Sequence, residues 1–146
     1  MEQDFKIIDL AKIKTNEGHM FPIYRDWDKD VHEDLVPEMV YVTTIEPGLK
    51  KDIIYHKKRK TFITSVQGKL LIEILSGNKI EKFYLSNENT DSNHKIAMIN
   101  PKIAFRLINQ GDKLAIVVNC PTHSWKPNSK EMIKFNNWEE FKKWKD

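Results

Sequence analysis

The stretch VYVTTIEPGLKKDIIYHKKRKTFITSVQGKLLIEIL, residues 40–75, carries the strongest structural signal in this chain. It contains short runs rich in Val, Ile, Thr, Tyr and Phe, and turn residues separate these runs. Pro47-Gly48 suits a type II turn, because proline fixes φ at the second position and glycine accepts a positive φ at the third. Gly68 lies between two strand-like runs and marks a tight bend or a bulge. The stretch therefore predicts consecutive antiparallel strands.

The same pattern extends to both sides of this stretch. Ser76-Gly77-Asn78 and Gln110-Gly111-Asp112 are expected to form hairpin turns. Such short strands, divided by turn residues, indicate one sandwich or barrel. The expected strands cover residues 6–10, 19–25, 39–46, 52–56, 60–67, 69–75, 79–85, 95–100, 104–109, 113–120 and 131–135.

One helix is expected, over residues about 137–145. Asn137 can cap its first turn, and Glu140 follows three residues later. Trp138, Phe141 and Trp144 repeat along one helix face, which predicts packing on the barrel or on a second subunit. Between the second and third expected strands, the polar segment 26–37 reads as a surface loop with Trp27 as its apolar anchor.

Composition sets the class of protein. The 146 residues are 40% hydrophobic and 31% charged, which fits a single globular domain spanning residues 1–146, with a barrel over about 6–135. No stretch reaches the roughly 20 apolar residues of a membrane helix. We expect no secretory signal and a lone, buried Cys120, both of which suit the cytoplasm. The basic run at residues 56–60 reads as a solvated loop, so neither nucleic acid nor membrane is an expected partner.

The stretch 40–75 resembles the core of the sugar-nucleotide cupins, the dTDP-4-dehydrorhamnose 3,5-epimerases and related 3,4-ketoisomerases. In that family a strand ends in Pro-Gly, a strand bearing His-x-His follows, and a hairpin then bends at glycine. Here Pro47-Gly48, the run 55–58 and Gly68 occupy those places. The resemblance covers roughly residues 6–136. It implies a mostly β fold, an antiparallel β-barrel or jelly-roll cupin with a C-terminal α-helix, and a homodimer.

Several family positions are altered in this chain. The first histidine of His-x-His falls on Ile54, and a later family histidine falls on Phe105. The tyrosine acid of the family falls near Ser124, beside His123. The resemblance therefore implies a cupin whose chemistry depends on fewer of the usual groups.

Epimerisation beside a ketone needs a base, an acid and a donor for the enolate. His56 is the expected base, because strand alternation puts it on the face of Ile54. His123 is the second candidate acid or base. The alternative for either histidine is a structural, inert role.

The expected substrate contacts come from side chains that can bind anions or donate a phenol. Arginine can hold a diphosphate bidentately. The alternative is that each is an ordinary surface or strand residue. These candidates are Lys51, Arg59, Arg106, Tyr24 and Tyr55.

A metal site and a cofactor are not expected. Metal-binding cupins use histidines and a glutamate from several strands, and only His56 stands at such a place. A cupin oxygenase is therefore disfavoured. The predicted function is epimerisation or isomerisation of a nucleotide-linked 4-keto-6-deoxy sugar in cell-surface polysaccharide biosynthesis. The alternative is a non-catalytic cupin that binds a sugar ligand or a protein partner.

Overall fold

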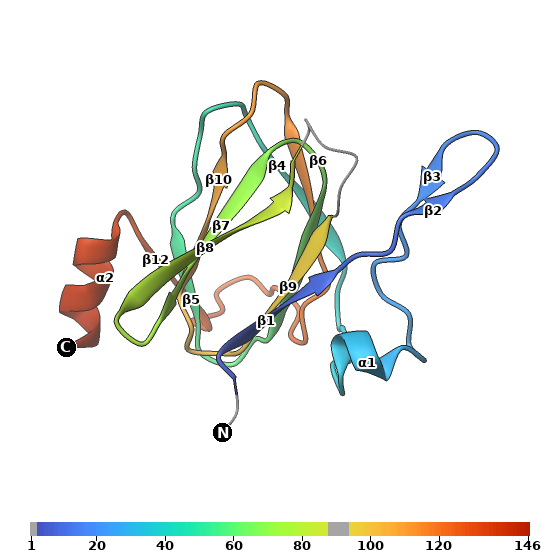
Figure 1. The fold of residues 1–146 in the computed structure, drawn as a ribbon. Helices are drawn as coiled ribbons and strands as arrows, with labels where there is room; N and C mark the ends of the chain where they lie inside the picture. Colours follow the sequence, from blue (N-terminus) through green and yellow to red (C-terminus); the bar gives the residue numbers. More distant parts are fainter. Residues whose placement is uncertain (1–2, 88–93) are drawn as a thin grey trace.

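Two five-stranded antiparallel sheets form the body of the protein (Figure 1), in a computed structural model that describes residues 3–87 and 94–146. The first sheet has the order β1 (Phe5–Asp9), β9 (Lys95–Ile99), β6 (Thr61–Gln67), β11 (Ala115–Asn119), β4 (Tyr41–Ile45). The second has the order β12 (Met132–Phe135), β5 (Ile53–His56), β10 (Phe105–Asn109), β7 (Leu70–Ser76), β8 (Lys79–Ser86). The mostly β, antiparallel class is confirmed.

The smaller elements differ from the expectation in two places. Of the strand expected at residues 19–25, only β3 (His19–Met20) forms, and it pairs with an unexpected strand, β2 (Ile13–Lys14). Phe21, Ile23 and Tyr24 instead pack against a buried cluster on the face of the first sheet that points away from the second sheet. The loop expected at residues 26–37 contains a short helix, α1 (Lys29–His32). Trp27 does not anchor it, because that side chain is 70% exposed, whereas Leu35 is buried.

The glycine turns of the central stretch form as expected. Gly48 has φ +76°, and the amide of Leu49 donates to the carbonyl of Glu46 at 3.2 Å, which closes the turn at Pro47-Gly48. Gly68 has φ +101°, and a Cβ atom there would lie 3.0 Å from the Cα of Ala115. A side chain at position 68 would therefore force β6 and β11 apart.

The turn at Gln110–Asp112 is not a hairpin, and this prediction was wrong. β10 pairs with β5 and β7, whereas β11 pairs with β4 and β6, so the turn carries the chain from one sheet to the other. The buried Asn109 amide holds this crossing by donating to the carbonyls of Ile45 and Lys113, both at 2.8 Å. Turn residues alone cannot distinguish a hairpin from a turn that connects strands of two different sheets.

Apolar side chains from both sheets fill the space between them. This inner cluster includes Ile45 and Ile63 from the first sheet, and Ile72, Phe105 and Leu107 from the second. A second cluster lies on the other face of the first sheet and contains Cys120, which is buried as expected. Burial raises the pKa of the Cys120 thiol. The protein thus uses its inter-sheet space mainly for hydrophobic packing.

Helix α2 (Trp138–Lys145) packs on the outer face of the second sheet (Figure 1). The side chain of Asn137 accepts the amide of Glu140 at 2.8 Å, so the predicted cap is confirmed. Phe141 is 1% exposed and contacts the rings of Phe135 and Tyr55. The aromatic face is therefore covered by the sheet, as predicted. Neither α1 nor α2, the helices within the described residues, is long and apolar enough to cross a membrane.

Candidate active site

His56 is the last residue of β5 and is 4% exposed. Alternation along the strand puts it on the face of Ile54, which packs against the inner cluster. Ile54 pairs directly with Phe105, and the ring centroid of His56 lies 6.3 Å from that of Phe105. The imidazole therefore sits at one end of the inter-sheet space, beside apolar side chains.

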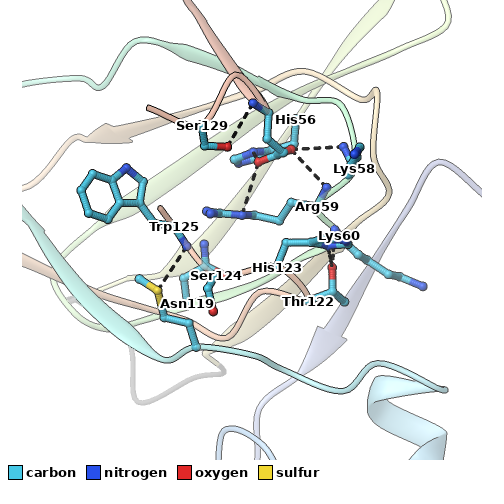
Figure 2. A network of polar contacts seen from close by, with 12 residues as sticks. His56, Lys58, Arg59, Lys60, Asn119, Thr122, His123, Ser124, Trp125 and Ser129 are labelled. Atoms are coloured by element: carbon cyan, nitrogen blue, oxygen red, sulfur yellow. Dashed lines mark hydrogen bonds and ion pairs between the residues drawn. The ribbon is translucent and has the colours of Figure 1, made fainter. Parts of the chain in front are cut away.

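Glu131 holds this imidazole, within a network of polar contacts in which His56, Lys58 and Arg59 lie close together (Figure 2). The Nδ1 atom of His56 lies 2.8 Å from Oε1 of Glu131. Oε2 of Glu131 accepts the backbone amides of Lys58 and Arg59, both at 3.1 Å. An ionised carboxylate only accepts hydrogen bonds, so Nδ1 carries the proton and the lone pair is on Nε2. This arrangement fixes the tautomer that a general base at Nε2 requires.

Arg59 supplies a buried positive charge next to this pair. It is 5% exposed, and its Nε atom lies 3.7 Å from Oε1 of Glu131, which is an ion pair but not a hydrogen bond. The Nε atom of Arg59 has no hydrogen-bond partner in the described part of the chain. A buried donor without a partner is costly, and a bound acceptor would satisfy it.

The pKa shifts of this cluster favour a neutral histidine and an ionised glutamate. Burial lowers the pKa of His56, and Arg59 adds to the effect, while Glu131 opposes it. Burial raises the pKa of Glu131, but the hydrogen bonds from the amides of Lys58 and Arg59 and from His56 outweigh this, so its pKa is lowered. His56 is therefore in the basic form at neutral pH.

These shifts make protein stability depend on pH. A histidine whose pKa is lowered by folding stabilises the fold above its unfolded pKa, about 6.5, and this stability is lost as pH falls through the folded pKa. We expect the free energy of unfolding to fall below pH 6.5, by at most about 1.4 kcal/mol per pH unit from this group. Urea denaturation at pH 5 to 8 measures it. The slope between pH 5 and 6.5 should flatten in His56→Asn, and an equal slope in the variant would contradict the assignment.

A cavity of about 440 Å³ opens on the far side of Glu131. His123, the second candidate acid or base, lies in its wall, and the Nδ1 atom of His123 is 2.9 Å from Oγ1 of Thr122. The wall also contains Lys57, Lys58, Lys126 and Lys130. His56 lies behind Glu131 and is not part of the wall. The structure thus brings His56, Arg59 and His123 to one end of the molecule, with Glu131 between them.

Two expected substrate contacts lie elsewhere on the second sheet. The guanidinium of Arg106 donates to the backbone carbonyls of Lys51, at 2.9 Å from Nε, and of Asn136. The ring of Tyr55 contacts Phe141 and Trp144 on the outer face. Both side chains therefore support the packing of helix α2.

The other two expected contacts lie near the first sheet. The Nζ atom of Lys51 donates to Oγ1 of Thr43 at 3.2 Å. The hydroxyl of Tyr24 donates to the carbonyl of Leu35 at 2.9 Å, and its ring contacts His32. Neither residue lines the cavity beside Glu131.

Two polar residues of the candidate site, Glu131 and Asn119, were missed by the sequence interpretation. Asn119 pairs with Ile63 of the inner cluster, so both side chains point to the inter-sheet space. Its Nδ2 atom donates to the hydroxyl of Tyr41 at 2.7 Å, while its buried Oδ1 atom has no partner in the described residues. Glu131 was expected only as the start of a strand. No spacing links it to His56, which is 75 residues away.

Across residues 3–87 and 94–146, no group of three or more His, Cys, Asp or Glu side chains is arranged to hold a metal ion. The absence of a metal and of a cofactor from the working protein stays a prediction.

Comparison with known proteins gives a structural likeness. No protein-family model and no curated protein sequence matches the chain. A dTDP-sugar isomerase from Desulfovibrio desulfuricans G20 is 15% identical with a TM-score of 0.77, over 92% of this chain and 86% of that one. A sugar 3,4-ketoisomerase from Thermoanaerobacterium thermosaccharolyticum, solved with TDP, is 16% identical with a TM-score of 0.70, over 98% of both chains.

A third similar structure is a dTDP-6-deoxy-D-glucose-3,5-epimerase from Legionella pneumophila, solved with dTDP-4-keto-L-rhamnose. It is 11% identical with a TM-score of 0.73, over 90% of this chain and 72% of that one. These TM-scores show a common fold. The chain has the fold of the dTDP-sugar isomerases, 3,4-ketoisomerases and 3,5-epimerases, the sugar-nucleotide cupins.

Proposed function

We propose that this protein is an epimerase or isomerase of a nucleotide-linked 4-keto-6-deoxy sugar in cell-surface polysaccharide biosynthesis. The observation that carries the proposal is the neutral His56, held at Nδ1 by Glu131 beside the buried charge of Arg59. A neutral base and an adjacent cation are what enolisation requires. The similar solved structures include a dTDP-sugar isomerase, a sugar 3,4-ketoisomerase with bound TDP and a 3,5-epimerase with bound dTDP-4-keto-L-rhamnose, which supports this class of substrate.

The proposed reaction begins with proton removal from the carbon next to the ketone. Nε2 of His56 takes the proton, the C–H electrons form a C=C bond, and the carbonyl electrons move to oxygen as an enolate. Arg59 donates to that oxygen through its unpartnered Nε–H. For an epimerisation, His123 returns a proton to the same carbon on the opposite face. For a keto shift, the proton of the neighbouring hydroxyl moves to the enolate oxygen, and His56 returns its proton to the former carbonyl carbon. No redox partner is needed.

The test is solvent exchange. Incubation with dTDP-4-keto-6-deoxyglucose in deuterated water should place deuterium on ring carbons next to the ketone, measured by NMR or mass spectrometry. Absence of deuterium with every 4-keto-6-deoxy sugar tried would support the non-catalytic alternative, a cupin that binds a sugar ligand or a protein partner.

One observation favours that alternative. Ile54 and Phe105 stand at family histidine positions, and they pair with each other and pack into the inner cluster. Apolar side chains therefore occupy space that a polar pocket would need. The deuterium experiment separates the two functions, because only enolisation exchanges a carbon-bound proton.

The remaining assignments follow from the same proposal. We place the whole chain, residues 1–146, in a single cupin domain in which the two sheets form a jelly-roll barrel, and we place the protein in the cytoplasm. Lys51, Arg106, Tyr24 and Tyr55 stay predictions as substrate contacts. Purified protein should contain no stoichiometric metal and need no cofactor.

We also propose a homodimer, which the β2–β3 hairpin supports. This hairpin projects from the body of the protein (Figure 1), and every residue from 11 to 20 is exposed. A two-stranded hairpin without a packing partner is marginally stable in water. Ile13 and Met20 pair across it and are 41% and 50% exposed. A second copy would cover them.

We expect light scattering to give twice the chain mass of 17.3 kDa at micromolar concentration. The double variant Ile13→Lys/Met20→Lys should shift the protein toward monomer, because two charges would then be desolvated at the interface. The matched control is Val36→Lys/Leu49→Lys, which changes two other exposed apolar residues and should leave the dimer intact. A monomeric wild type would contradict this assembly, and a dimeric hairpin variant would contradict this interface.

A further inference from the structure

The segment that follows α1 begins with a strained turn. Glu33, the residue after α1, has φ +56° and ψ −121°. The amide of Leu35 donates to the carbonyl of His32 at 3.0 Å, so Glu33 occupies the second position of a tight turn. A type II′ turn needs a positive φ at this position, where glycine is usual. Any other residue is strained there and persists only where its surroundings hold it.

Two lysines hold the Glu33 carboxylate. The Nζ atom of Lys6, on β1, lies 2.9 Å from Oε1, and the Nζ atom of Lys60, just before β6, lies 3.6 Å from Oε2. The hydrogen bond from Lys6 and the charges of both lysines lower the pKa of Glu33. The side chains of Lys6 and Glu33 are 38% and 44% exposed. This contact is therefore weak and sensitive to salt.

A second local cost lies beside the turn. His32 is 3% exposed, and its Nδ1 atom has no hydrogen-bond partner among the residues that the structure describes. A buried polar atom without a partner costs free energy, and water would satisfy it if the segment opened. The turn and this histidine therefore favour opening. The two lysines and the burial of Leu35 oppose it.

The same segment is attached to the loop that contains His123 (Figure 2). The amide of Glu38 donates to the carbonyl of Pro121 at 3.0 Å, and Oε1 of Glu38 accepts the amide of Ser124 at 3.1 Å. The hydroxyl of Ser124 donates to the carbonyl of Glu38 at 3.2 Å. Glu38, Ser124 and His123 all line the cavity of about 440 Å³. Movement of residues 33–39 would therefore move one wall of this cavity.

We propose that residues 33–39 form a strap that opens and closes on the outer face of the first sheet, latched by the ion pairs of Glu33 with Lys6 and Lys60. When these ion pairs break, the strained turn relaxes and the strap lifts. Glu38 then releases the loop that it holds, which widens the cavity. The strap thus controls access to the cavity, whatever reaction the protein catalyses.

The test uses Cys120, the only cysteine of the chain, as a reporter. Its thiol is 2% exposed and lies in the same buried cluster as Leu35 of the strap. Lys6→Ala/Lys60→Ala should speed modification of Cys120 by a thiol reagent about tenfold, because losing two exposed ion pairs favours local opening by this order. Hydrogen–deuterium exchange should also rise in peptides that cover residues 33–39 and 121–126.

Glycine distinguishes a strained latch from an ordinary surface ion pair. Adding Glu33→Gly to the double lysine variant should restore slow modification of Cys120, because glycine adopts a positive φ without strain. Adding Glu33→Ala should not restore it, because alanine keeps the strain. Salt should speed modification in the wild type and have little effect on the lysine variant.

The matched control is Glu139→Ala, which breaks the exposed ion pair with Lys143 on α2 and should leave Cys120 at the wild-type rate. Urea denaturation gives the loss of global stability in each variant, and the lysine variant should react faster than this loss explains. An unchanged Cys120 rate in the lysine variant, or a rate that follows global stability alone, would overturn the inference. Equal rates with glycine and alanine at position 33 would also overturn it.

Discussion

His56→Asn is expected to slow solvent deuterium exchange into dTDP-4-keto-6-deoxyglucose by about 10²–10⁴-fold, the usual contribution of a positioned general base. Asparagine keeps a polar side chain of similar size that can still contact Glu131, so the fold should remain. It has no basic nitrogen at neutral pH. Deuterium at ring carbons, followed by NMR under single-turnover and steady-state conditions, gives the rate directly.

The matched control for this prediction is His19→Asn, which changes an exposed histidine on the β2–β3 hairpin and should exchange at the wild-type rate. Circular dichroism checks that both variants are folded. If His56→Asn exchanges as fast as the wild type, His56 is not the base. His123→Asn then becomes the decisive variant, because His123 lines the adjacent cavity.

Glu131→Ala is expected to lower the free energy of unfolding by about 3–5 kcal/mol, the range for breaking a buried ion pair by removing one partner. The change removes the acceptor of the His56 imidazole and of two backbone amides. It also leaves the Arg59 guanidinium buried without its anion, since the side chains of Arg59 and Glu131 are 6% and 14% exposed. Urea denaturation at pH 7 measures the loss.

Glu139→Ala is the control for this effect. Glu139 also forms an ion pair, with Lys143, but both side chains are about 80% exposed, so the change should have almost no effect on stability. Glu131→Gln keeps an acceptor oxygen and removes the charge, so its cost should fall between the two. A loss below about 1 kcal/mol in Glu131→Ala would mean that water replaces the carboxylate and that the cluster is not a dry site.

The local features of the fold were predictable because they depend on neighbouring residues. Pro47-Gly48 closes a turn with Gly48 at positive φ, and Asn137 caps α2, as their residue types indicate. The strand-like runs of residues 40–75 form β4, β5, β6 and β7. Strand β2 and its pairing with β3 escaped prediction because both strands are two residues long and exposed, which leaves no hydrophobic alternation to detect.

The candidate site was only partly predictable. His56 stood out because strand alternation puts it on the face of Ile54, and His123 because it lies beside Ser124, where the family's tyrosine falls. The structure places both at one end of the molecule. Arg59 was expected to bind a diphosphate, yet its burial beside Glu131 suits it to a developing enolate instead. Glu131 gave no signal in the sequence, although its carboxylate accepts the hydrogen bonds of the His56 imidazole and of the Lys58 and Arg59 amides.

Turn type, strand periodicity and helix capping are determined by adjacent residues, since each depends on backbone conformation within a few positions. They established that this chain is a mostly antiparallel β protein with a C-terminal helix. The pairing of strands does not depend on adjacent residues in this way, because backbone N–H and C=O groups can hydrogen-bond to any strand that packing brings beside them. Pairing of β12 with β5 sets Met132 opposite His56 and so brings Glu131 to the imidazole. The burial that lowers the His56 pKa likewise arises from residues distant in the chain.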